Sequence, residues 1–144
     1  MDDLVQFLRD RLEQEEAACR AARKDGGGSW NLLAFERGDG AIYDDMGNPV
    51  LTYDVDPSTG VANRHDENPL GAQQAAFIVR HDPDRVLTDI RAKRQLVDKY
   101  AEVADNDVND VEYAHGYANA LGEAVRLLAL PYADHPNYRQ EWRP

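Results

Sequence analysis

The chain has 144 residues, of which 42% are hydrophobic and 30% charged, and its formal net charge is −11. That length suits a single domain spanning residues 1–144, and the negative charge disfavours direct binding to nucleic acid. No apolar run approaches the ~20 residues of a membrane span, and the acidic start differs from a secretory signal. Cys19 is the only cysteine and cannot form an internal disulfide, so we expect a cytoplasmic protein.

Residues 1–24 predict a helix. Apolar residues recur at helical spacing between Leu4 and Leu12, and small alanines continue the pattern to Ala22. The three glycines at 26–28 end the helix. Because its second half is small and its first half is apolar on one side, we expect this helix to pack on the C-terminal helices, with a two-fold dimer interface as one option.

Residues 29–60 change to a near-alternating pattern, which predicts a three-stranded antiparallel meander. We expect the strands at Trp30–Phe35, Ala41–Tyr43 and Val50–Tyr53, with turns at residues 37–40 and 44–48. The run Asp56-Pro57-Ser58-Thr59-Gly60 closes the meander with turn-forming residues, and the polar stretch 61–69 predicts a loop.

Residues 70–130 predict three helices. A short one spans Leu70 to His81, and Asp82 and Pro83 then supply an N-cap and a first helical residue for a helix that runs to about Ala104. An acidic connector at residues 105–110 leads to the last helix, which ends before Pro131. Its expected buried stripe comprises Ala114, Tyr117, Ala118, Leu121, Val125 and Leu128.

The tail at residues 131–144 is rich in proline and aromatic residues. Large rings favour burial, and prolines lower the entropy cost of ordering an irregular segment. We therefore predict an ordered tail whose interaction residues, Tyr132, Tyr138 and Trp142, dock on the body of the protein or on a partner. The fold class that follows is α+β: a helix, a three-stranded meander, three helices and a docked tail.

No set of residues with catalytic or cofactor-binding spacing stands out. The chain lacks a Gly-rich phosphate loop and a nucleophile elbow, so we predict no catalytic residues and no cofactor. Glu112 and His115 have the Glu-x-x-His spacing of di-iron helix bundles, but such bundles use it twice. We expect no bound metal and regard this pair as the first candidates should one occur.

Two further functions stay open at this stage. Acidic helices bind magnesium in helical nucleotide hydrolases, and Glu13 and Glu16 could face Asp98 and Glu102 in that way. Alternatively, the high negative charge suits an acidic inhibitor or DNA mimic in phage–host conflict.

The stretch His81-Asp82-Pro83-Asp84-Arg85-Val86-Leu87 and the ending LALPYADHPNYRQEWRP, residues 128–144, resemble a family of unknown function from actinobacteria and their phages. The opening helix and the alanine-rich segment before His81 are similar to that family too. The resemblance implies a source and a context, and it transfers no catalytic residue. Our hypothesis is that the chain is a small acidic accessory protein, not an enzyme, and that it acts by binding a protein partner. A second copy of the chain is one candidate for that partner.

Overall fold

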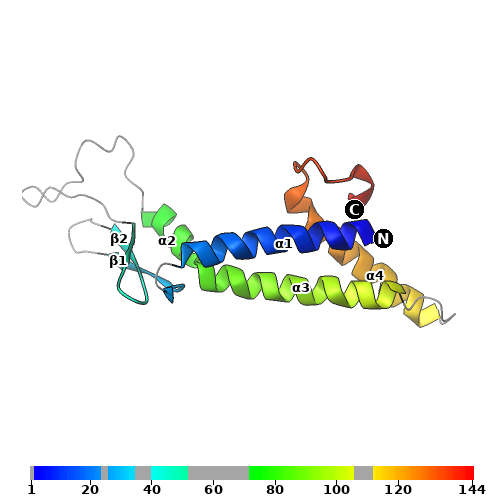
Figure 1. Ribbon diagram of the computed structural model, residues 1–144, viewed down its shortest axis with the longest axis horizontal. Coiled ribbons are helices and arrows are strands. Elements are labelled where there is room, and N and C mark those ends of the chain that lie inside the picture. Colours follow the sequence, from blue (N-terminus) through cyan, green and yellow to red (C-terminus); the bar gives the residue numbers. More distant parts are fainter. Residues whose placement is uncertain (1, 24–25, 35–39, 52–71, 106–111) are drawn as a thin grey trace, which may run out of the picture. The chain divides into compact units, whose positions relative to one another are not determined.

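The computed structural model describes residues 2–23, 26–34, 40–51, 72–105 and 112–144. Its elements run in the order helix, three strands, three helices and a tail with two short 3-10 helices (Figure 1). This order confirms the predicted α+β fold class. The chain divides into two compact units, residues 1–17 with 88–144 and residues 18–87. The single domain expected from the chain length stays a prediction.

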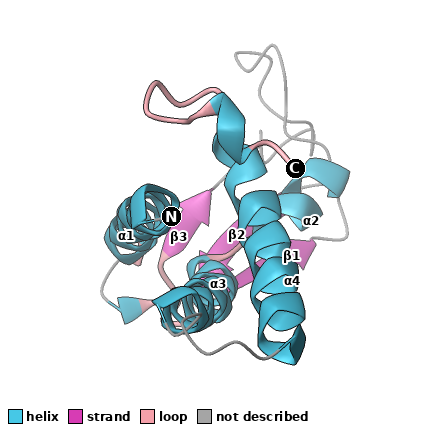
Figure 2. Cartoon of the chain, turned by 90° about the vertical axis from the view of Figure 1, so that its right-hand side faces the viewer, coloured by secondary structure: helices cyan, strands magenta, loops and turns pink. Residues whose placement is uncertain are grey.

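Three helices build the first unit: α1 (Asp2–Ala22), α3 (Pro83–Asp105) and α4 (Glu112–Ala129). Both α1 and α3 also supply residues to the second unit. Within the first unit α3 lies between α1 and α4 (Figure 2). Each helix turns one apolar stripe inward, as helical spacing dictates. Within the first unit, the buried residues on these helices are Leu4, Val5, Phe7, Leu8, Leu12, Ile90, Val97, Tyr100, Val125 and Ala129.

The predicted buried stripe of α4 was wrong at Tyr117, which lies on the exposed side of the helix. Tyr117 is 40% exposed, whereas Val125 is completely buried. The reason lies in the composition of this helix, because residues 113–122 contain no charged side chain. Without a polar face to mark the solvent side, the apolar pattern fits more than one orientation of the helix.

Ion pairs join α1 to α3 in the first unit. Arg9 Nη2 lies 2.7 Å from Asp98 Oδ1, and Arg94 pairs with Glu16. Partly exposed pairs of this kind contribute about 1 kcal/mol or less. They therefore orient the two helices more than they stabilise them, and the expected packing of α1 on a C-terminal helix is observed.

The second unit contains an antiparallel sheet in the order β1 (Trp30–Ala34), β2 (Gly40–Asp44), β3 (Pro49–Leu51), together with α2 (Ala72–Arg80). Trp30 pairs with Asp44 and Leu32 with Ile42 across β1 and β2, and the register to β3 shifts at Ile42 and Tyr43. α2 packs against β1 and β2. Ile42, fully buried, and Ala75 form the centre of this small core.

The connection between β2 and β3 is built around the buried carboxyl of Asp44. Asp44 Oδ1 accepts hydrogen bonds from the backbone N–H of Asn48 at 2.7 Å and of Met46 at 3.0 Å, and Oδ2 accepts one from the Asn48 side chain. Burial opposes the charged form, but the hydrogen bonds from Asn48 and Met46 outweigh it, so the pKa of Asp44 is lowered. Gly47 completes the turn with φ at +83°.

Several predicted segments lie outside the described residues. They are residues 1 and 24 of the first helix, the last residue of the first strand, Phe35, the end of the third strand at 52–53, the turn residues 37–39 and 56–60, the polar stretch 61–69, the start of the short helix at 70–71 and most of the acidic connector, 106–110.

Candidate functional site

Phe7 is the centre around which the aromatic tail folds. Its ring centroid lies 5.0 Å from that of Trp142, 6.1 Å from that of Tyr138 and 6.2 Å from that of Tyr132. Tyr138 and Trp142 are buried, with 8% and 7% of their surface exposed, and Tyr132 is half-buried. The three predicted interaction residues thus contact their own chain inside the first unit. Contact with a second protein through them stays a prediction.

Polar contacts fasten the tail to the same helix. The hydroxyl of Tyr132 donates a hydrogen bond of 2.6 Å to Glu15 Oε1, and Arg139 lies 2.7 Å from Asp3 Oδ2. His135 contacts the guanidinium of Arg11. Burial, the hydrogen bond to Glu15 and the charge of that carboxylate raise the pKa of Tyr132 well above its ordinary value. The phenol therefore stays protonated and keeps donating across the whole physiological pH range.

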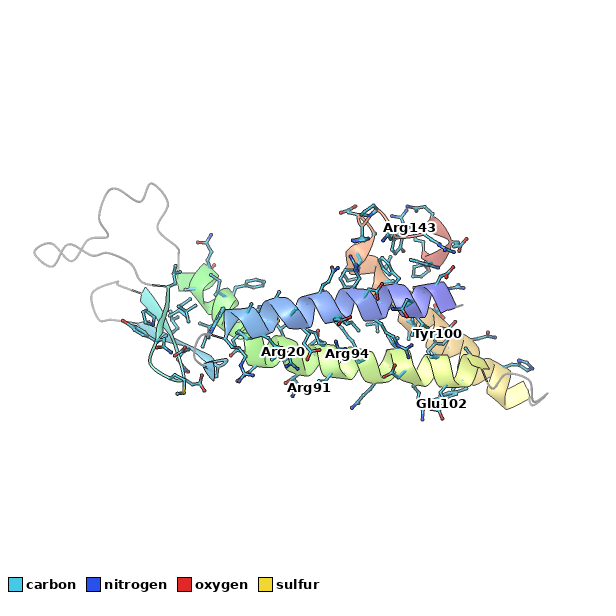
Figure 3. All side chains as sticks on the ribbon, in the orientation of Figure 1. Arg20, Arg91, Arg94, Tyr100, Glu102 and Arg143 are labelled. Atoms are coloured by element: carbon cyan, nitrogen blue, oxygen red, sulfur yellow. The ribbon has the colours of Figure 1, made fainter. Side chains whose placement is uncertain are left out.

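A groove of about 370 Å³ lies beside the tail, between α3 and α4. It is lined by Tyr100, Ala104, Ala118, Asn119, Gly122, Glu123, Arg126 and Pro144. Tyr100 projects from α3 toward α4 (Figure 3), and a Cβ on Gly122 would lie only 3.2 Å from its Cε2 atom. The missing side chain at 122 therefore lets the tyrosine ring lie against α4. Burial raises the pKa of Tyr100, and the nearby charge of Arg126 partly offsets this.

Next to the groove, α4 presents apolar residues to solvent. Leu127 is 52% exposed and Tyr117 40%, and Leu130, directly after the helix, is 36% exposed. Gly116 and Ala120 are exposed on the same side. We call Gly116, Tyr117, Ala120, Glu123, Leu127 and Leu130 the outward face of α4.

Two of the carboxylates considered for magnesium binding, Glu16 and Asp98, are paired with arginines. Asp98 pairs with Arg9 and Glu16 with Arg94, so these two acids are not brought to one another. Across the described ranges, no three His, Cys, Asp or Glu side chains converge in a way that could hold a metal ion. Glu112 is the first residue of α4, and His115 is exposed one turn later.

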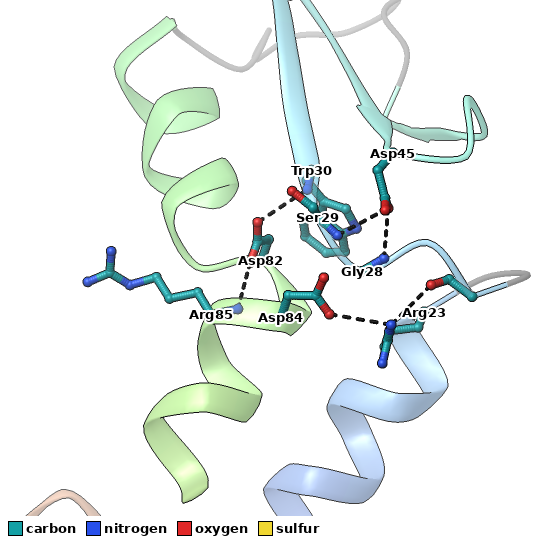
Figure 4. Close-up of polar contacts among 9 residues, drawn as sticks. Arg23, Gly28, Ser29, Trp30, Asp45, Asp82, Asp84 and Arg85 are labelled. Atoms are coloured by element: carbon teal, nitrogen blue, oxygen red, sulfur yellow. Dashed lines mark hydrogen bonds and ion pairs between the residues drawn. The ribbon is translucent and has the colours of Figure 1, made fainter. Parts of the chain in front are cut away.

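A second polar cluster joins the start of α3 to the loop before β1 in the second unit (Figure 4). Asp82 caps α3 as predicted, since Oδ1 accepts from the N–H of Arg85 at 2.8 Å, and Oδ2 also accepts from the N–H of Trp30 at 3.2 Å. Asp45 accepts from the N–H of Gly28 at 3.0 Å, and Gly28 O accepts from the N–H of Asp84 at 3.1 Å. These acids bind backbone groups, and we assign them a structural role.

Sequence reasoning missed the groove and the outward face of α4. The signal available for them was the uncharged run at residues 113–122, which is unusual in a chain with 30% charged residues.

Among the described helices, none is both long enough and apolar enough to cross a membrane.

A model for a family of unknown function, DUF6221, matches residues 1–144. The chain belongs to this family. Membership in DUF6221 confirms the resemblance to a family of unknown function, while the actinobacterial or phage origin stays a prediction. Neither the curated proteins nor the solved structures contain a significant match to this chain.

Proposed function

We propose that this DUF6221 member is a small acidic accessory protein that acts by binding another protein, in an actinobacterial or actinophage setting, and that it is not an enzyme. The observation that carries the proposal is the outward face of α4. Leu127 and Tyr117 on this helix and Leu130 directly after it remain substantially exposed, and residues 113–122 of the helix carry no charge. Contiguous exposed apolar residues mark interaction surfaces in proteins whose remaining surface is polar.

Burial of these three side chains alone contributes too little free energy for stable association. Fully burying a large apolar side chain contributes about 1.5–3 kcal/mol, and here each is already partly covered. Loss of translational and rotational freedom on association costs roughly 4–15 kcal/mol. The groove beside the face adds contact area, because Gly122 and Arg126, which line it, belong to the same helix as the face. We therefore assign the face and the groove together as the binding surface.

Two other functions have weaker support. A nucleotide hydrolase would need free carboxylates facing one another, whereas Asp98 pairs with Arg9 and Glu16 with Arg94. A DNA mimic rests on the net charge of −11 alone. Neither function uses the outward face of α4.

The test places a photo-crosslinking amino acid at Tyr117 of the full chain in the organism that encodes it. We expect irradiation to join one protein species to this position. The A120R variant should abolish the cross-link, because it puts a charge into the contact. A92R is the matched control, since Ala92 is an exposed alanine on α3. A cross-link that A120R leaves unchanged, or no cross-link at all, contradicts the proposal.

A further inference from the structure

We propose that the outward face of α4 binds the same face of a second copy of this chain, with the two helices antiparallel about a two-fold axis near Glu123. This inference rests on the proposed function, because it names the partner that the face binds.

The spacing along the face is that of a helix–helix seam. Gly116, Ala120, Glu123, Leu127 and Leu130 follow one another at intervals of four, three, four and three residues. This alternation keeps side chains on the line of contact between two helices packed at a shallow angle. All five residues are exposed, so the seam is unoccupied within the described part of the chain.

The order of sizes along the seam favours a second copy in the antiparallel orientation. The small residues Gly116 and Ala120 lie at one end, and the large residues Leu127 and Leu130 lie at the other. An antiparallel two-fold pair sets Ala120 against Leu127 of the second copy and Gly116 against Leu130, so each leucine meets a position with room for it. A parallel pair would set small against small and large against large.

The charges of the face match in the same arrangement. Glu123 and Arg126 lie one helical turn apart and are both exposed. An axis near Glu123 brings the two Glu123 carboxylates close together, and the glutamate of each copy also comes within side-chain reach of Arg126 of the other. The two reciprocal pairs offset the repulsion between the glutamates. Residues 113–122 of α4 add no further carboxylate to the contact.

Sedimentation and light scattering on the full chain test the proposal across a concentration series. We expect a concentration-dependent dimer, whose dissociation constant rises about tenfold or more in A120R and in L127E, because each sets a charge against an uncompensated apolar group. A92R should dimerise like the wild type. Circular dichroism establishes that each variant is folded.

An equimolar mixture of A120R and L127E then tests the orientation itself. In the mixed dimer one contact pairs the new cation with the new anion, and the other keeps the original alanine and leucine. We expect the mixture to dimerise at concentrations at which each variant alone is monomeric. A mixture that stays monomeric overturns the antiparallel register.

A cross-linking measurement keeps the proposal testable if a charged variant does not fold. A short bismaleimide should join two copies of C19S/E123C, where the added thiols lie near the axis, and should not join C19S/A92C. A wild-type chain that remains monomeric at all concentrations, together with no cross-link at 123, overturns the dimer. If the Tyr117 cross-link to a different protein persists in that case, the proposed function stands and only this inference falls.

Discussion

The ring of Trp142 lies 5.0 Å from the ring of Phe7, so the last residues described in the chain pack on its first helix. Tyr138 packs edge-on against the same Trp142 ring at 5.7 Å. Edge-to-face pairs add about 0.5–1.5 kcal/mol each beyond the area they bury. The tail is therefore part of the core of the first unit.

Replacing Trp142 by alanine should lower the free energy of unfolding by about 3–5 kcal/mol, the usual cost of emptying a buried tryptophan site. Deleting residues 132–144 should lower the melting temperature by several degrees or make the protein insoluble. Thermal unfolding followed by circular dichroism measures both effects, with Q140A as a control at an exposed neighbour. A W142A variant that melts with the wild type would show that the ring contributes no core packing.

Tyr132→Phe removes the hydrogen bond to Glu15 and should cost roughly 1.5–3 kcal/mol, as for bonds to charged acceptors. The raised pKa gives a second readout, since the folded state favours the protonated phenol. This contribution is fully present below about pH 10, the ordinary tyrosine value, and is lost as the pH rises through the folded pKa. Urea titrations at increasing alkaline pH should show a loss of stability in the wild type that is smaller in Y132F. Equal losses in both proteins would exclude Tyr132 as the source.

Asp44→Asn should weaken the dependence of stability on acid pH. Because the folded state lowers the pKa of Asp44, its carboxylate stabilises the turn above the ordinary value of about 4, and this contribution is lost as the pH falls through the folded pKa. Denaturant melts at pH 7 and at successive values below 4 measure the slope. D134N, at an exposed position, should retain the wild-type slope. If D44N and D134N behave alike, the lowered pKa has no part in stability.

Gly27→Ala should lower the free energy of unfolding by about 1–3 kcal/mol through overpacking. An added Cβ would overlap the carboxyl of Asp44 and lie 2.9 Å from its Cβ atom, which cannot swing away. G116A is the control, since nothing lies within 4 Å of a Cβ there and alanine favours a helix by about 1 kcal/mol over glycine. Melts at low protein concentration should therefore shift in opposite directions. A G27A protein as stable as the wild type would mean that the loop before β1 rearranges freely.

Local signals predicted the elements of this fold well. Asp82 followed by Pro83 marks the start of α3 because a carboxylate that caps free N–H groups and a ring that fixes φ act within one turn of chain. The leucines of α1 mark its buried side because charged residues such as Arg9, Asp10 and Glu13 occupy exposed positions around them. Helix caps and helical periodicity depend on residues that are close together in the sequence. They can therefore be predicted from the sequence alone.

Tertiary structure alone decided what those elements contact. By its sequence, Asp98 could bind a metal ion or form an ion pair. In the folded chain it forms an ion pair with Arg9, which is 89 residues away in the sequence. Tyr117 fitted a buried stripe by spacing, yet it is exposed because Val125 and Ala129 fill the inner side of α4. The tail needed an apolar surface, and its partner Phe7 lies at the other end of the sequence. These contacts form where two surfaces exclude water from each other. The periodicity of one segment shows which of its sides is apolar, but it does not show which other segment covers that side.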